Sequence, residues 1–451
     1  MTVTPTSNQT HSDTQLARRL GLFDATMIVM GGIIGAGIFS NPSVVAQRVH
    51  TPLLILGAWV AGGLIALAGA FIYAELSSQV TESGGQYVYL RDALHPLVAF
   101  VYGWSLLFVI QTGGMAAVAL IFANHVFESL GRTASDWAAA LLAATGLALL
   151  TVVNCLGVRA GSITQNVFMI LKLMVIAGLV IVGLALSSPA ANAPTPQVSN
   201  QSTWQLLIAF GAALIPAQFA FGGWQTSCFV AGDVREPKKT LPRALLLGVL
   251  GVIVVYLSVN YVCVHVLGPE LLARTKTPTS AVMRLALGEK GARFMAAGIA
   301  ISTVGFLSQS MLTAPRVYFA MAEDKLFFNR LAWLNRAQVP AFAIGLQGGL
   351  AIVITLVASR FEQILNYVVS VDVVFFGLTA VCVLVIRRRS LASDFFRIPG
   401  HPITTLFFIL ACCVITSSVI YKDHLGSAIS FGIMFLGVPA YFLWAWQKPD
   451  R

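Results

Sequence analysis

Long runs of apolar residues, separated by short polar stretches, dominate this chain. A run of about 20 apolar residues is long enough to cross a hydrocarbon core about 30 Å thick as a helix. Twelve such runs occur, and each predicts a membrane-spanning helix. They cover residues 22–47, 53–79, 96–127, 137–156, 161–188, 204–231, 243–267, 294–321, 340–358, 362–386, 402–420 and 425–446.

The composition agrees with a lipid environment. Of the 451 residues, 57% are hydrophobic and 10% are charged, whereas about 25% of an ordinary soluble domain is charged. The longest stretches without a predicted span, residues 189–203 and 268–293, are too short to fold as a second domain. We therefore expect an all-α membrane protein with one integral domain over residues 21–451. Residues 1–20 are polar and rich in Ser and Thr, which favours a disordered cytoplasmic tail.

The basic residues indicate topology rather than nucleic-acid binding, although the formal net charge is +10. They lie in the loops between the apolar runs. If the N-terminus is cytoplasmic, the inside loops and tails hold 18 of the 28 Lys and Arg residues. This bias predicts that both termini are cytoplasmic, as an even number of spans requires. The stretch 268–293 opposes the bias, because it places five basic residues on the predicted outside.

Glycine clusters interrupt the first and the sixth predicted spans. They are Gly31 to Phe39 in the first and Phe219 to Trp224 in the sixth. Because the two spans are five helices apart, the second group of five would enter the membrane from the opposite side. The pattern predicts an inverted repeat of five plus five helices, residues 22–188 and 204–386, followed by two helices in residues 402–446. Helices interrupted at matching places in inverted halves indicate a transport site near the bilayer midplane.

Four motifs form a recognisable set. Residues 32–39 read GIIGAGIF, residues 75–89 contain SGGQY, residues 219–237 contain FAFGGW and AGDVREP, and residues 312–322 read LTAPRVYFAMA. Together they resemble the amino acid–polyamine–organocation family. Lys172 in the fifth predicted span makes the chain most similar to the L-type amino acid transporters and their bacterial relatives.

The resemblance implies the fold of the sodium-coupled leucine transporters and a free amino acid as substrate. Two departures qualify it. Ala36 stands where the family's first-helix motif has a serine, which leaves side-chain selectivity open. The external loop 128–136 lacks the cysteine that ties animal members to an accessory glycoprotein. We therefore expect no disulfide-linked accessory subunit and a location in a bacterial inner membrane.

An amino acid at the bilayer midplane needs donors for its carboxylate and acceptors for its ammonium. If the first helix unwinds at Gly35, Ala36 and Gly37, the free N–H groups that open its second half face the carboxylate. Carbonyl groups near Ile33, and near Phe219 and Gly222 in the sixth helix, would accept from the ammonium. An alternative is that Gly31-x-x-x-Gly35 only packs helices together.

Lys172 is the one Lys or Arg deep within a predicted span. An ammonium in hydrocarbon must find carbonyls, hydroxyls or water. The resemblance implies that Lys172 occupies the space of a sodium ion in coupled relatives and joins the first-helix interruption to Ser308 or Ser310 of the eighth span. Sodium-independent transport is the resulting prediction. A lysine that snorkels to the membrane interface is the alternative.

Further polar and aromatic residues are candidates for the site. Asp372 in the tenth span would recognise a polar or cationic side chain, take part in proton coupling, or pair with a polar neighbour. Phe219, at the family's external gate position, Phe221 and Trp224 would cap or line the cavity. Weaker pocket candidates are Gln111, Met115 and Gln225. Glu75 and Arg316 lie near cytoplasmic span ends, where loop or gate ion pairs are expected.

The function predicted from these features is secondary transport of free, neutral amino acids by alternating access. No nucleotide-binding module, metal motif or catalytic cluster is recognised, so neither a cofactor nor an enzymatic activity is expected. Polyamines or other organic cations are the alternative substrates, mainly because of Asp372. A channel or a sensor is a further alternative, but neither explains two interrupted helices. Exchange and proton coupling both remain open as the energy source.

Overall fold

A computed structural model describes residues 18–186, 202–357, 361–389, 395–422 and 424–446, with the backbone alone for residues 361–370 and 445. Nearly all of this described chain is helical, and its one β-type contact is an isolated bridge between Leu20 and Val234.

The first half of the helical chain consists of α1 (Leu22–Ile33), α2 (Gly37–Ala46), α3 (Pro52–Gln79), α4 (Gln86–Ala93), α5 (Pro96–Ser105), the π-helix η1 (Leu106–Gln111), α6 (Thr112–Ser129), α7 (Asp136–Cys155) and α8 (Val158–Leu186). The second half consists of α9 (Thr203–Phe221), α10 (Thr226–Phe229), the 3-10 helix η2 (Ala231–Asp233), α11 (Pro237–Arg274), α12 (Pro278–Thr313), α13 (Pro315–Glu323), the 3-10 helix η3 (Asn329–Ala332), α14 (Ala341–Val357), α15 (Phe361–Arg389), α16 (Ile403–Lys422) and α17 (His424–Trp446).

The helices are long and apolar enough to cross a membrane. Nine spans in the described chain meet this criterion, and a tenth is added if the bent pair α1 and α2 is one span. Large apolar side chains point outward from the peripheral helices, such as Leu149 at 64% exposure and Ile181 at 66%. In water such a surface would aggregate, whereas lipid solvates it. The sequence-based prediction of a multi-span helical membrane protein is confirmed.

Local sequence explains where several helices begin. Proline stands in the first turn of α3, α5, α11, α12 and α13, where its missing N–H has no intrahelical partner to lose. The Ser135 hydroxyl accepts a hydrogen bond from the Ala138 amide and caps α7. Ser202 and Gln205 form a reciprocal capping box at the start of α9. These signals fix helix starts without reference to the rest of the fold.

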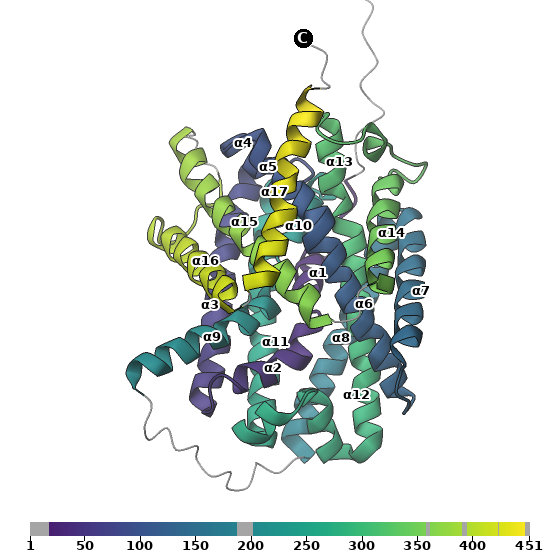
Figure 1. The fold of residues 1–451 in the computed structure, drawn as a ribbon, viewed down its shortest axis with the longest axis vertical. Helices are drawn as coiled ribbons and strands as arrows, with labels where there is room; N and C mark the ends of the chain where they lie inside the picture. Colours follow the sequence, from purple (N-terminus) through teal and green to yellow (C-terminus); the bar gives the residue numbers. More distant parts are fainter. Residues whose placement is uncertain (1–17, 187–201, 358–360, 390–394, 423, 447–451) are drawn as a thin grey trace, which may run out of the picture.

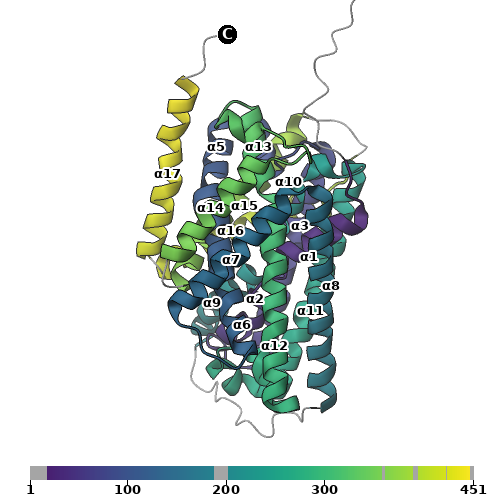
Figure 2. The same ribbon diagram turned by 90° about the vertical axis from the view of Figure 1, so that its right-hand side faces the viewer.

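The helices around α1 and α12 form the centre of the molecule. Burial covers 78% of the most apolar stretch of α12 and α13, but 28% of the corresponding stretch of α8 and 33% of that of α17. Helix α11 packs along α3 and α1, and α12 packs along α8 and α6. Figure 1 shows α1 near the middle of the bundle, and Figure 2 shows α17 at its outer edge. The interrupted helix α1–α2 is therefore enclosed by protein.

The stretch 268–293, for which the sequence predicted no span, is mostly helical. Helix α11 continues past Gly268 to Arg274, and α12 begins at Pro278 and passes Gly288. Both glycines have positive φ, 69° and 68°, which side-chain-bearing residues rarely adopt. The chain can therefore turn sharply at each glycine and resume a helix. The charged side chains of this stretch are what hid it from a search for apolar runs.

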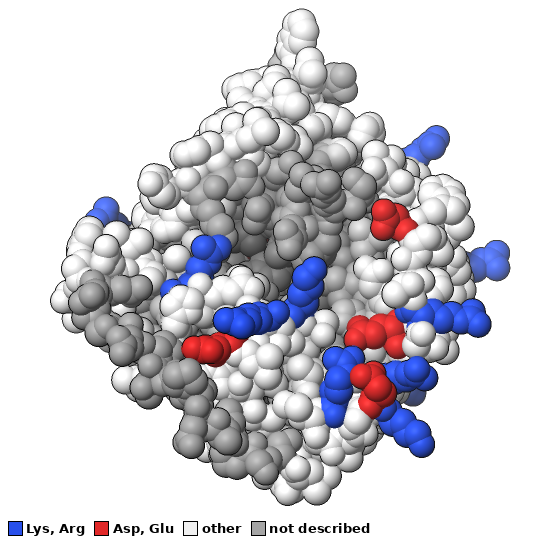
Figure 3. All heavy atoms as spheres, turned by 60° about the horizontal axis from the view of Figure 1, so that its bottom comes forward, with Lys and Arg blue, Asp and Glu red and all other residues white. Residues whose placement is uncertain are grey.

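The two ends of the molecule differ. We call the end that carries α4, α13 and the last turn of α17 the terminal end, and the end that carries the last turn of α11 and the start of α12 the far end. Figure 3 shows basic and acidic side chains intermixed on the far end. One such pair joins Arg284 to Glu289 at 2.7 Å. Pairs of this kind offset part of the positive charge that opposed the predicted orientation.

Candidate functional site

The first span is interrupted at residues 34–36, which we call the first break. Helix α1 ends at Ile33 and α2 begins at Gly37, and the two helix axes are bent by 42°. The amide of Phe39 donates to the Ala36 carbonyl. The amides of Ala36, Gly37 and Ile38 have no hydrogen-bond partner in the described chain. As the first N–H groups of α2, they form the positive end of its dipole and suit a carboxylate.

The sixth predicted span is interrupted at residues 222–225, which we call the second break. Helix α9 ends at Phe221, and α10 begins at Thr226. Gly223 adopts φ 112°, and a Cβ built on it would lie 2.1 Å from the Gly32 carbonyl oxygen. A Cβ on Gly37 would lie 3.1 Å from the Ala220 Cα. The backbone at and beside the first break therefore touches the backbone at and beside the second, at a closeness that glycine alone allows.

A cavity of about 140 Å³ lies beside the two breaks. Of the residues predicted from the sequence, its wall includes Ile33, Gly35, Ala36, Gly37, Phe219, Gly222, Asp372 and Ser310, together with the weaker candidates Gln111, Met115 and Gln225. The structure adds polar side chains from other helices, namely Ser40, Asn41, Gln218, Thr226 and Gln309. Backbone amides and polar side chains thus meet inside a mostly apolar enclosure, as is typical of small-molecule sites.

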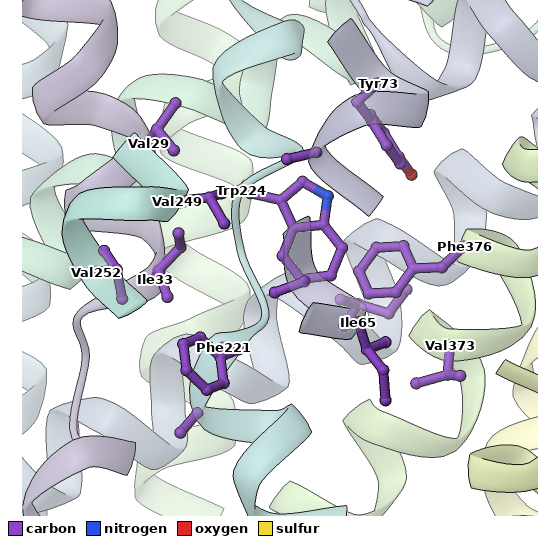
Figure 4. Close-up of a cluster of buried hydrophobic side chains, with 14 of the residues drawn as sticks. Val29, Ile33, Ile65, Tyr73, Phe221, Trp224, Val249, Val252, Val373 and Phe376 are labelled. Atoms are coloured by element: carbon purple, nitrogen blue, oxygen red, sulfur yellow. The ribbon is translucent and has the colours of Figure 1, made fainter. Parts of the chain in front are cut away.

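Two aromatic residues that were predicted to cap or line the cavity, Trp224 and Phe221, do not reach its wall. Trp224 is fully buried, and its ring packs on Phe376 at 5.1 Å between ring centroids and on Phe408 at 6.5 Å. Phe221 is also fully buried and packs on Trp59 and Tyr256. Figure 4 shows Trp224 and Phe376 facing each other, and Phe221 on the same stretch of chain as Trp224. These aromatic rings therefore pack beside the second break without lining the cavity.

Lys172, in the middle of α8, is completely buried. Its ammonium donates a hydrogen bond to the Ile34 carbonyl oxygen in the first break. On the facing helix α12 it lies against Gly305, where a built Cβ would be 3.5 Å from the Lys172 Nζ. The buried hydroxyls of Ser308 and Ser310 have no hydrogen-bond partner in the described chain. Their contact with Lys172 remains a prediction.

Tyr256 of α11 is a site residue that the sequence analysis missed. Its buried hydroxyl lies 2.9 Å from the Ile33 carbonyl oxygen and 3.0 Å from that of Ala220. The Ile33 carbonyl also accepts from the Gly35 amide at 2.9 Å. The phenol therefore joins the ends of α1 and α9 through its one hydrogen. A tyrosine in the middle of an apolar run was the available signal, because its hydroxyl needs a partner in hydrocarbon.

Replacing Tyr256 with phenylalanine is expected to raise KM for the amino acid substrate that the sequence predicts about tenfold, the cost of one buried hydrogen bond. The ring would keep its contacts with Trp59 and Phe221, at 5.7 Å and 4.9 Å between centroids. Initial uptake rates over a range of substrate concentrations measure the effect. Tyr261→Phe is the matched control, because that tyrosine on the same helix is 50% exposed. An unchanged KM for Tyr256→Phe would contradict the role.

Ion pairs join segments of the chain at the terminal end of the molecule. The Arg316 guanidinium donates to the Asp233 carboxylate at 3.1 Å, and both side chains are at most 1% exposed. Burial raises the pKa of the Asp233 carboxyl, and the neighbouring Arg316 opposes this shift. The Asp233 carbonyl accepts the Leu20 amide at 2.9 Å, which fastens the start of the described chain to the loop after the second break.

Two further ion pairs join helices at this end. Arg91 of α4 donates to Asp324, just after α13, at 2.9 Å. Glu75 of α3 receives a bidentate contact from Arg387 of α15, at 2.5 Å for each bond. Loop or gate ion pairs were expected from the sequence at Glu75 and Arg316, and both residues form ion pairs. The three pairs thus link α3, α4, α13, α15 and the loop after the second break through charge.

The fold and the site together define a multi-span helical membrane protein with an internal cavity between two interrupted helices. The chain belongs to the amino acid permease family, whose model matches residues 20–444. This confirms the family resemblance seen in the sequence.

Individual relatives match over nearly the whole chain. The serine/threonine exchanger SteT of Bacillus subtilis is 27% identical over 95% of this chain and 97% of its own length. The human large neutral amino acids transporter small subunit 2 is 30% identical over 97% of this chain and 82% of its own length. The mouse b(0,+)-type amino acid transporter 1 is 27% identical over 96% of this chain and 90% of its own length.

Proposed function

We propose that this protein is a sodium-independent secondary transporter that carries free, neutral amino acids across a membrane by alternating access. The observation that supports this most directly is the pair of breaks in α1–α2 and α9–α10, which leaves the amides of Ala36, Gly37 and Ile38 free beside a cavity. A carrier needs such groups to hold a zwitterion without water. Membership of the amino acid permease family, and relatives that transport or exchange amino acids, favour the same function.

We propose a finer architecture on the same basis. The chain would cross the membrane twelve times, with α1–α2 and α9–α10 as the unwound first and sixth helices of two inverted five-helix repeats. Helix α14, 17 residues long, and α15, which ends in three arginines, would supply spans nine and ten. The terminal end would face the cytoplasm of a bacterium, so that its layered ion pairs form the inner gate. The protein would work without a disulfide-linked accessory subunit.

Lys172 supports the absence of sodium coupling. Its ammonium places a fixed positive charge against the Ile34 carbonyl, where a bound cation would otherwise stabilise the first break. A second cation at the same place would meet direct repulsion. Energy for uptake would come from exchange against another amino acid or from a proton.

Asp372 favours one alternative substrate class. Its Oδ1 is buried at the cavity wall and has no hydrogen-bond partner in the described chain. A polyamine or another organic cation would satisfy this carboxylate directly. Asp372→Asn, which keeps the size and removes the charge, is expected to lower competition by cationic substrates about tenfold more than competition by neutral ones. Labelled uptake with competing amino acids and amines at several pH values measures this, and unchanged selectivity and pH dependence would leave Asp372 a structural role.

The proposed transport is tested with purified protein in liposomes. Labelled alanine or leucine should enter saturably in sodium-free buffer, and unlabelled amino acid inside the vesicles should accelerate entry by counterflow. Replacing choline with sodium outside should not change the rate. Flux that neither saturates nor shows counterflow would identify a channel. Uptake of amines with no uptake of amino acids would establish the alternative substrate class instead.

A further inference from the structure

Gln309 of α12 and Thr226 of α10 form a hydrogen-bonded pair across the cavity wall. The Gln309 Nε2 donates to the Thr226 Oγ1 at 2.6 Å, and the Thr226 hydroxyl donates to the Gly223 carbonyl at 2.7 Å. Both side chains line the cavity and are almost fully buried. A Cβ built on Gly32 would lie 2.8 Å from the Thr226 Oγ1. The pair therefore lies directly against the end of α1.

The pair fixes which way the Gln309 amide points. A threonine hydroxyl has one hydrogen, and the Gly223 carbonyl can only accept it. The Thr226 oxygen must therefore accept from its other partner, and only the NH₂ group of Gln309 can donate. The Gln309 Oε1 is thus turned away from Thr226 and held in one orientation.

Among the described residues, this oxygen has no hydrogen-bond partner. Gln309 is 1% exposed, and its Oε1 makes no hydrogen bond within the described chain. A buried acceptor without a donor costs about 1–3 kcal/mol. The cost is recovered when a donor enters the cavity, so the position is suited to recognising a ligand.

Two more residues that line the same cavity carry a buried oxygen without a hydrogen-bond partner in the described chain. They are Gln218 on α9, through its Oε1, and Asp372 on α15, through its Oδ1. The amide oxygens of Gln309 and Gln218 and the two carboxylate oxygens of Asp372 are four acceptors, whereas an amino acid's ammonium carries three hydrogens. The surplus calls for a donor elsewhere on the substrate, namely on its side chain.

We propose that Gln309, oriented by Thr226, is a specificity-determining residue that favours amino acids whose side chain carries a hydrogen-bond donor. This rests on the proposed transport of amino acids and adds the class of side chain. A site built around a polar contact rejects the analogue that lacks the polar group, because its own acceptor is then left unpaired. Thr226 acts as a positioning residue through Gln309.

Serine and alanine, which differ by one hydroxyl, are the probes. The wild-type protein in liposomes should show a kcat/KM for serine about tenfold above that for alanine, the value of one buried hydrogen bond. Gln309→Met keeps the chain length and removes the polar atoms. It should bring the serine-to-alanine ratio to within about twofold of one.

Variants of Thr226 supply an independent test of the proposal. Thr226→Val keeps the shape, frees the Gln309 amide to rotate, and should lower the serine-to-alanine ratio at least about threefold. Thr226→Ser restores the hydroxyl and should restore the ratio. Thr303→Val is the matched control, because the Thr303 hydroxyl bonds within its own buried helix to the Ile299 carbonyl at 3.1 Å. Its ratio should equal that of wild type.

The outcomes are separable. An equal loss of serine and alanine transport in folded Gln309→Met would assign Gln309 to the ammonium and overturn the proposal. A wild-type preference for alanine, or a ratio unchanged by both Gln309→Met and Thr226→Val, would also overturn it. If Gln309→Met does not fold, the comparison of Thr226→Val with Thr226→Ser decides. Absence of any amino acid uptake by wild type would instead refute the proposed function.

Discussion

Lys172→Ala is expected to reduce amino acid uptake on the order of 100-fold. The substitution removes the ammonium that donates to the Ile34 carbonyl and leaves that carbonyl buried without its charged partner. It also opens a void between α8 and Gly305 of α12. The first break holds the amides proposed to bind the carboxylate. A distortion of the break should therefore lower the transport rate. Initial uptake rates in liposomes, with and without sodium, measure the effect.

Three comparisons make this result specific. Lys172→Met keeps the volume and removes the charge, and it should be as inactive as Lys172→Ala if the charge is what matters. Lys239→Ala should transport normally, since that side chain is 72% exposed at the surface. Size-exclusion profiles and melting temperatures identify variants that do not fold. Normal, sodium-independent uptake by Lys172→Ala would end the proposed role of this lysine.

Gly223→Ala is expected to abolish transport and lower the melting temperature. Gly223 has φ 112°, and the new methyl group would lie 2.1 Å from the Gly32 carbonyl oxygen. Backbone strain alone costs about 1–3 kcal/mol, and relief of the clash requires the two breaks to move apart. That movement would separate the free amides of the first break from the carbonyls of the second. Uptake assays and thermal unfolding of the purified protein test both consequences.

Helix α9, which precedes the second break, supplies the control. Gly211 lies inside α9, and a Cβ built there meets no atom within 4 Å. Alanine has a higher helix propensity than glycine by about 1 kcal/mol. Gly211→Ala should therefore keep full transport and leave the melting temperature equal or higher. Equal behaviour of the two glycine variants would show that close contact between the breaks is not required.

The sequence predicted much of the architecture because the bilayer imposes a simple rule on each segment. Apolar runs of sufficient length had to be helices, and proline and capping residues marked where several of them begin. The rule that apolar runs mark helices failed where a helix carries many charged side chains. Residues 268–293 carry many charged side chains, so they were not predicted as helical, yet Gly268 and Gly288 let α11 and α12 continue there. A helix rich in charged side chains does not stand out as an apolar run, whatever its backbone does.

The candidate site was predictable in its backbone and only partly in its side chains. Glycine clusters indicated where α1 and α9 stop, because glycine tolerates the necessary dihedrals and close approach. Trp224 was placed near the cavity by its neighbours in sequence, but its ring packs on Phe376, which lines the cavity in its place. Which side of a non-helical segment a side chain takes depends on the neighbouring helices, and no local pattern encodes it.

By itself, the sequence determined that the chain is helical, that it belongs in a membrane, that glycine clusters interrupt two of its apolar runs, and that one lysine lies deep in such a run. These properties follow from composition and from residues adjacent in the chain. Only the tertiary structure decided that Tyr256 joins the two breaks, that Lys172 reaches the Ile34 carbonyl, and that Thr226 orients Gln309. Each of these contacts pairs groups 36 to 223 residues apart, and their geometry exists only after the helices have packed.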